Sequence, residues 1–151
     1  MNNIFLEEDT TEIINRINKL NPDSKPRWGK MTVAQMLAHC NVTYAYTYEP
    51  EKFRKPSFFM CFILKTIVKK YVLSAKPYKQ NGRTGPDFII TGERNFEMEK
   101  EKLIQNITRT QQLSEKHFQG LENLSFGKMS AKEWNTMFSK HLNHHLGQFG
   151  V

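Results

Sequence analysis

Apolar residues recur along this chain every three or four positions, which is the period of an amphipathic helix and not of a strand. Two segments show the pattern most clearly, residues 10–20 and residues 32–48. The apolar stripe of the first is Ile13, Ile14, Ile17 and Leu20, and that of the second is Val33, Met36, Leu37, Cys40 and Tyr44. The sequence therefore predicts a helix in each segment, with one face in the core.

Polar residues predict where three of the helices begin. A Ser or Thr followed three residues later by Gln or Glu is a capping box, and the pattern occurs in Thr32–Gln35 and Ser130–Glu133. Asp9–Glu12 resembles the same signal, so we expect the first helix to begin after Asp9. Asn21-Pro22 then ends that helix, because proline cannot continue it.

The remaining segments extend the helical pattern. Residues 57–73 predict a covering helix that is apolar at its start and basic at its end, and residues 93–117 and 130–149 predict two further long helices. Residues 74–92 are rich in Gly, Pro and Asn and predict a long ordered loop with a short extended piece at 88–90. We therefore expect one all-α domain over residues 1–151, a bundle of four long helices with one inserted helix.

Composition changes this picture little. The 151 residues carry a net charge of +7, but Lys and Arg are spread among Glu and Asp, so we interpret the charge as solvation and do not expect nucleic-acid binding. The most apolar run, Phe58–Leu64, is far shorter than the ~20 residues that span a bilayer. The N-terminal residues do not resemble a secretory signal. These features predict a cytoplasmic protein with no membrane partner.

The two cysteines do not form a metal or redox motif. Cys40 and Cys61 are far apart in the sequence and each has apolar neighbours. We therefore expect reduced, buried thiols and no disulfide framework.

Three histidines lie on predicted core faces and are the candidate ligands of a metal. His141 and His145 are four residues apart, so their Cβ atoms lie ~5–6 Å apart on one side of a helix. His39 borders the apolar stripe of the second helix and is the candidate third ligand. Three neutral imidazoles that leave a coordination position open are typical of a catalytic zinc site. The spacing is equally compatible with ordinary core histidines.

Other polar residues are expected to support this group. Gln148 lies one turn after His145 and can orient a ligand or a bound water. His144 lies toward the flank of the same face, where we expect it to be exposed or to contact the ligands. The loop that roofs the group is expected to include Tyr78, Arg83 and Asp87. No carboxylate is placed by the sequence as a general base, so no catalytic residue is assigned.

Two motifs resemble the DinB/YfiT-like superfamily of metal-dependent proteins. They are MTVAQMLAH at Met31–His39 and HLNHHLGQ at His141–Gln148. Members carry one histidine on the second bundle helix and an H-x-x-x-H pair on the last. Lys30 and the Glu133-Trp134 pair are similar to an uncharacterised bacterial subgroup. The resemblance extends coarsely over the whole chain, but its specific motifs occupy only residues 28–39 and 126–149.

The resemblance implies a four-helix bundle with a long crossover between the second and third bundle helices. It also implies a divalent metal, zinc or nickel, held by His39, His141 and His145. Relatives include transferases and an isomerase that use a low-molecular-weight thiol, and members often form dimers. This chain differs from the family at Leu146, where Arg is common, so a contact made by that arginine is not expected here.

Two functional hypotheses follow from these observations. The first is a metal-dependent enzyme that acts on a small molecule, either as a thiol-dependent transferase or as a hydrolase. The alternative is a non-catalytic helical module for protein interaction or homodimerisation, with the apolar segment 58–64 as its interface.

Overall fold

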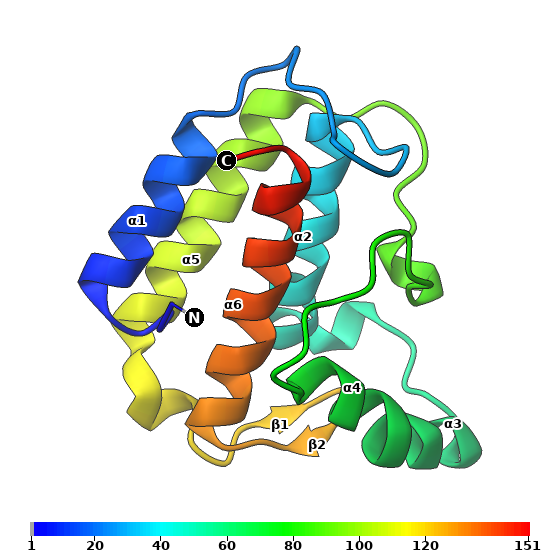
Figure 1. Cartoon of the computed structure of the whole chain (residues 1–151). Coiled ribbons are helices and arrows are strands. Elements are labelled where there is room, and N and C mark those ends of the chain that lie inside the picture. The colour runs from blue at the N-terminus through cyan, green and yellow to red at the C-terminus, as the bar shows by residue number, and fades with distance from the viewer. Residues whose placement is uncertain (1) are drawn as a thin grey trace.

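The structure is a computed structural model that describes residues 2–151, and it is mostly helical, as expected (Figure 1). The long helices are α1 (Glu7–Asn18), α2 (Val33–Tyr48), α5 (Phe96–Phe118) and α6 (Ala131–Gln148). Two short helices, α3 (Phe58–Ile63) and α4 (Lys69–Leu73), are joined by the π-helical turn η2 (Leu64–Val68). The 3₁₀ turns are η1 (Pro50–Lys52) and η3 (Pro86–Phe88).

The described residues also contain one small β-hairpin that the hydrophobic pattern did not predict. Strands β1 (Glu122–Asn123) and β2 (Gly127–Lys128) pair in antiparallel register between α5 and α6. Two-residue strands are too short to show the alternation by which strands are recognised.

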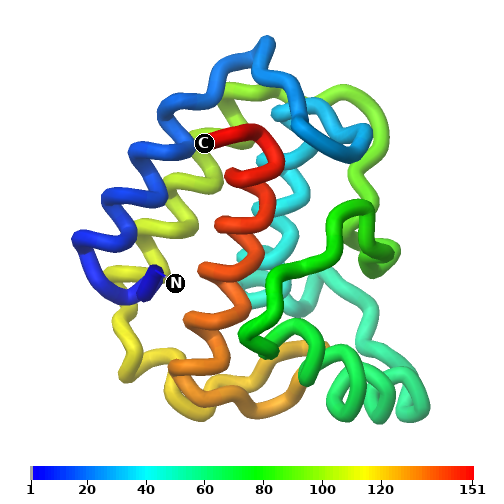
Figure 2. Tube along the Cα trace, viewed as in Figure 1, coloured from blue at the N-terminus to red at the C-terminus, as the bar shows by residue number. Residues whose placement is uncertain are grey.

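The four long helices lie side by side, and the rest of the chain lies outside them (Figures 1 and 2). Helix α2 packs against α5 and α6, and α1 packs against the same two helices. The chain leaves this group after α2 and rejoins it at α5. Between them, α3, η2 and α4 lie near one end of the long helices, and the following loop returns along their side to η3, which contacts α2.

Two of the helices begin at the predicted capping boxes, but the expectation for the first helix needs correction. Thr32 and Ser130 each form the predicted capping box, at α2 and α6. Helix α1 instead begins at Glu7, with Leu6 at the N-cap position and no side-chain cap. Asp9 lies inside the helix, where its carboxylate accepts a hydrogen bond from the Asn3 backbone N–H at 2.6 Å. Acidic residues of the first turn stabilise this start through the helix dipole.

Three other expectations need correction. The short extended piece expected at 88–90 is present only in part, because Phe88 ends the turn η3 and Ile89 then has extended backbone angles without joining a strand. Helix α5 is interrupted at Ser114, which has φ 62° and ψ 170°. Cys40 is buried and Cys61 only partly, since α3 does not enter the core; both thiols are free. None of the described helices is long and apolar enough to cross a membrane.

Aromatic residues of α2 and α6 form the part of the core next to the candidate site. The Tyr44 and Phe138 rings stack with centroids 4.8 Å apart, and the Phe138 ring also stacks on Trp134 at 5.6 Å. Trp134, Phe138, His141 and His145 follow one another along one face of α6. That face therefore changes from an aromatic core to a group of imidazoles toward the C-terminus.

The Tyr44 hydroxyl is buried and has no hydrogen-bond partner among residues 2–151. Removing an unpaired buried hydroxyl relieves its desolvation cost, so we expect Tyr44→Phe to raise the free energy of unfolding by about 1 kcal/mol. The matched control is Tyr48→Phe on the same helix, because the Tyr48 hydroxyl bonds Thr110 Oγ1 at 2.6 Å. Urea unfolding should show that the control is destabilised. Equal destabilisation of both variants would contradict the prediction.

Candidate metal centre

Helices α2 and α6 bring the three candidate histidines together. His39 comes from α2, and His141 and His145 come from successive turns of α6. One ring nitrogen of each residue lies within 4.8 Å of those of the other two. His39 and His145 are buried, and His141 is partly buried. The group predicted from spacing thus exists in the fold as a compact cluster.

Hydrogen bonds to the Nδ1 atoms determine the tautomers of two of the rings. His39 Nδ1 lies 2.8 Å from the Phe88 carbonyl oxygen, and His145 Nδ1 lies 2.9 Å from Gln148 Oε1. Both oxygens only accept, so each Nδ1 carries the proton and each Nε2 has a free lone pair. This is the usual arrangement of metal-binding histidines, in which the second ring nitrogen donates to an outer partner.

The orientation of the Gln148 amide is itself determined by the chain. Its Nε2 donates to the Trp28 carbonyl oxygen at 2.8 Å, which leaves Oε1 to face His145. Gly29 adopts a φ of +84°, and a Cβ there would lie 2.7 Å from Gln148 Nε2. The close approach of the loop before α2 to Gln148 therefore requires glycine.

His141 differs from the other two histidines because its outer partner can either donate or accept. Its Nδ1 lies 3.1 Å from Thr43 Oγ1, and its Nε2 lies 3.0 Å from His39 Nε2. Since His39 Nε2 is unprotonated, the metal-free pair is satisfied when His141 Nε2 donates to it and Thr43 donates to Nδ1. If a metal takes the place of that proton, the Thr43 hydroxyl turns and accepts from Nδ1.

The electrostatic environment keeps these imidazoles neutral. Burial is the main cause that lowers the pKa of His39, and of His141, where the neighbouring imidazoles lower it further. Burial, followed by the proximity of His39, lowers the pKa of His145 to about 3. A neutral imidazole is the form that binds a metal, so protons do not compete for this group near neutral pH.

The distance between two of the ring nitrogens suits a transition metal. Imidazole nitrogens bound to one ion at ~2.0–2.1 Å lie about 2.9–3.4 Å apart when the ligand angle is between right and tetrahedral. The 3.0 Å between His39 Nε2 and His141 Nε2 falls in this range. No carboxylate or thiol of the described residues joins the cluster. Nitrogen ligands favour zinc or nickel, whereas Mg²⁺ and Ca²⁺ require oxygen.

Aromatic rings surround the cluster. Phe88 contacts His39 and His141 with ring centroids 5.5 and 6.3 Å apart. His144 is partly buried beside His145, and its ring also meets Tyr78 at 5.6 Å and Trp28 at 5.9 Å. His144 is therefore a neighbour of the group rather than an exposed residue.

The predicted roof of the group is correct in only one of its three residues. Tyr78 reaches His144, but Arg83 is exposed, and Asp87 accepts a hydrogen bond from the Tyr46 hydroxyl. The residues that sequence reasoning missed are Thr43 and Phe88. Thr43 lies four positions after His39 on the same helix face, which was a usable signal. Phe88 takes part through its backbone carbonyl, which no side-chain pattern reports.

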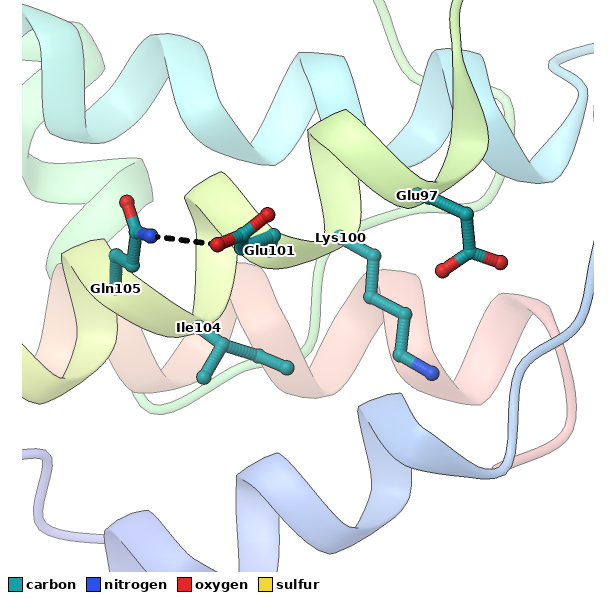
Figure 3. Close-up of a pocket in the computed structure, with 5 residues that line it drawn as sticks. All are labelled: Glu97, Lys100, Glu101, Ile104 and Gln105. Carbon is teal, nitrogen blue, oxygen red and sulfur yellow. Dashed lines mark hydrogen bonds between the residues drawn. The ribbon is translucent and has the colours of Figure 1, made fainter.

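A surface hollow on α5 is unrelated to this chemistry. It is lined by Glu97, Lys100, Glu101, Ile104 and Gln105, all of which come from α5 (Figure 3). Gln105 Nε2 donates to Glu101 Oε1 at 3.1 Å, which is an ordinary pairing along one helix. This hollow has none of the convergent groups that a binding site needs.

Comparison with known proteins identifies a family but no characterised relative. The sequence model of a family described as "Protein of unknown function (DUF1569)" matches residues 5–150. The match covers nearly the whole chain, so the chain belongs to this family. Neither the curated proteins nor the solved structures contain a match.

Proposed function

We propose that this member of the DUF1569 family is a metal-dependent enzyme acting on a small molecule, with Zn²⁺ or Ni²⁺ held by His39, His141 and His145. One observation carries the proposal. Three buried or partly buried imidazoles converge, and each Nδ1 has its own oxygen partner. Histidines that only fill a core also need hydrogen-bond partners, but here all three outer partners bond Nδ1 and leave the three Nε2 atoms to a metal.

The arrangement of the chain also supports a distant relationship to the DinB/YfiT-like superfamily, which we include in the proposal. The single histidine lies on the second long helix and the pair on the last, and a long excursion separates α2 from α5. These are the features that a four-helix bundle of that superfamily would have. The homodimer expected from the same resemblance stays a prediction.

The proposed chemistry needs little from the chain beyond holding the ion and shaping its surroundings. A divalent ion with three neutral ligands supplies Lewis acidity, which activates a thiol or a water for transfer or hydrolysis. Phe88 beside His39, and Trp28 and Tyr78 beside His144, would limit the access of water and offer apolar contacts to an organic substrate. Gln148 and Thr43 would hold the ligand rings.

Metal analysis followed by an activity screen tests this proposal. The purified chain, reconstituted with zinc or nickel, should retain about one ion per chain after exhaustive dialysis, as a single three-histidine site requires. The loaded protein is then screened for consumption of a low-molecular-weight thiol and for hydrolysis of small esters and amides. Absence of bound metal would favour the alternative of a non-catalytic module.

Thr43 provides a sharper test of the ligand arrangement. Thr43→Val keeps the shape of the side chain but removes the oxygen that bonds His141 Nδ1 at 3.1 Å. We expect a loss of metal affinity of roughly 10- to 100-fold, the usual effect of losing an outer partner. Thr43→Ser keeps the hydroxyl and should bind nearly as wild type. Competition with a chelating dye measures both, and equal affinity of the two variants would contradict the assigned role.

A further inference from the structure

The helical excursion α3–η2–α4 carries a large apolar surface that no described residue covers. Its exposed fractions are 92% for Phe58, 71% for Phe59, 62% for Phe62 and 64% for Ile67. Ser57 caps the helix by accepting a hydrogen bond from the Met60 backbone N–H, so these side chains are presented by ordered helix. Single exposed apolar residues are common, but three phenylalanines within five positions are not. We call Phe58, Phe59, Phe62 and Ile67 the apolar tip.

The positive charge of the protein is concentrated in the segment of sequence that contains this tip. Residues 52–86 contain nine of the 22 Lys and Arg and no Asp or Glu. The other residues hold 13 basic against 15 acidic side chains, so this one segment accounts for the net charge of +7. The interpretation that Lys and Arg are spread evenly among Glu and Asp is therefore wrong. The net positive charge belongs to this one segment. Arg54 and Lys55, just before the tip, are exposed and have no ion-pair partner among residues 2–151.

The rigid attachment of the segment makes this surface a defined part of the fold. Lys69 forms a 3.0 Å ion pair with Glu133 of α6, and Lys140 Nζ donates to backbone carbonyls at the end of α4. These contacts bind the inner side of the excursion to α6. Helix α3, which carries the three phenylalanines, lies at the other end of the excursion, farther from the long helices than α4 (Figure 1).

The combination of charge and apolar side chains indicates which kind of partner this surface binds, a second copy of the chain or a lipid bilayer. In a second copy docked through the same face, the exposed Arg54 and Lys55 of each partner would face the same positive charges of the other, which is unfavourable. An anionic bilayer satisfies both features, because its headgroups attract Lys and Arg while aromatic rings enter the boundary with the acyl chains. The expectation of no membrane partner was based on the absence of a segment long enough to span a bilayer. It does not apply to binding at the bilayer surface.

We propose that residues 52–71 dock this protein peripherally on an anionic lipid surface. Phe58, Phe59 and Phe62 enter the interfacial region, and Arg54, Lys55 and Lys70 contact the headgroups. The depth is that of an interfacial helix, about 5–10 Å. This docking does not depend on the proposed metal chemistry, and it would hold for a protein that binds no metal.

Sedimentation with vesicles tests the proposal. The full chain is mixed with vesicles of phosphatidylcholine alone or of phosphatidylcholine with phosphatidylglycerol. Binding is expected only to the anionic vesicles and should weaken as salt rises, because the headgroup attraction is screened. Phe58→Ser/Phe59→Ser/Phe62→Ser should lower the partition coefficient at least about tenfold, and Arg54→Glu/Lys55→Glu by about fivefold or more for each residue changed.

Matched variants separate this effect from general changes of surface. Met98, an apolar residue of α5 that is 70% exposed, and Lys132, exposed on α6, are changed to Ser and Glu as controls that should bind as wild type. The tip side chains are exposed, so circular dichroism and thermal unfolding should show all variants folded. Three results would overturn the proposal. The first is no binding to anionic vesicles, and the second is equal binding of wild type and the tip variants. The third is that the phenylalanine substitutions weaken retention on single-stranded nucleic acid but not binding to vesicles. A dimer that dissociates on loss of the tip, without vesicle binding, would assign the surface to a second copy instead.

Discussion

Replacement of His39 or His145 by alanine is expected to abolish stoichiometric metal binding. Each change removes one of three ligands. The ion would then be held by two imidazoles, and water would have to fill the rest of its coordination shell. The loss should exceed the roughly 10- to 100-fold that follows from removing an outer partner. The metal content of wild type and both variants is measured by mass spectrometry after identical reconstitution with zinc or nickel and dialysis.

Two controls make this experiment specific. His117→Ala removes an exposed histidine from the last turn of α5, outside the cluster, and should leave metal content unchanged. A ligand that binds only the folded protein raises its stability, so added metal should raise the Tm of wild type and of the control but not of the ligand variants. If wild type holds no more metal than His39→Ala and His145→Ala, the metalloenzyme proposal fails.

Replacement of Lys140 by methionine is expected to cause a large loss of stability and to loosen the excursion after α4. Lys140 Nζ donates to the carbonyl oxygens of Tyr71, Val72 and Ser74 at 3.1 Å or less. It also lies over the Tyr78 ring, 4.3 Å from the centroid. Burial lowers the pKa of Lys140, but the carbonyls and the ring face stabilise the ammonium form, so we expect the residue to be charged.

Methionine cannot donate the hydrogen bonds that the Lys140 ammonium group makes. It fills the volume of the alkyl stem but leaves three carbonyls without their cationic donor, and a hydrogen bond to a charged group contributes about 1.5–3 kcal/mol. We expect urea unfolding to show a loss of about 2–3 kcal/mol. Limited proteolysis should cut residues 74–92 faster, because the end of α4 is no longer held to α6.

Lys132→Met is the matched control, since Lys132 is an exposed lysine on the same helix. It should change stability by no more than about 0.5 kcal/mol, the usual range of a surface substitution. Equal stability and equal proteolysis of the two variants would show that the contacts of Lys140 do not hold the excursion.

Much of the candidate site was predictable because helices repeat regularly. The spacing of His141 and His145 was sufficient to place both on one face of α6, and the stripe of α2 was sufficient to direct His39 inward. Gln148 was placed correctly for the same reason, one turn from the residue that it contacts. The capping boxes at Thr32 and Ser130 also held, since each is a local interaction over four residues. The capping box expected at Asp9 does not form, because the helix already begins at Glu7, before Asp9.

The parts of the site that sequence could not supply are those made by segments without periodicity. The Phe88 carbonyl bonds His39 across 49 positions of the chain, and the Trp28 carbonyl bonds Gln148 across 120. Every residue has a backbone carbonyl, so nothing in the sequence distinguishes these two. Leu146 illustrates the same limit from the other side, because it is 1% exposed and belongs to the core, a burial that the sequence pattern of the last helix did not assign to it.

By itself, the sequence determined which stretches are helical, which face of each enters the core and that three histidines lie on such faces. These properties follow from local periodicity and capping, which act over a few residues. Only the tertiary structure decided that His39 meets His141 at 3.0 Å, which tautomers the rings adopt and which apolar residues remain uncovered. Those outcomes depend on how helices far apart in the chain pack and on where the 49–95 excursion lies. Such long-range packing leaves no periodic signal in the residues that it brings together.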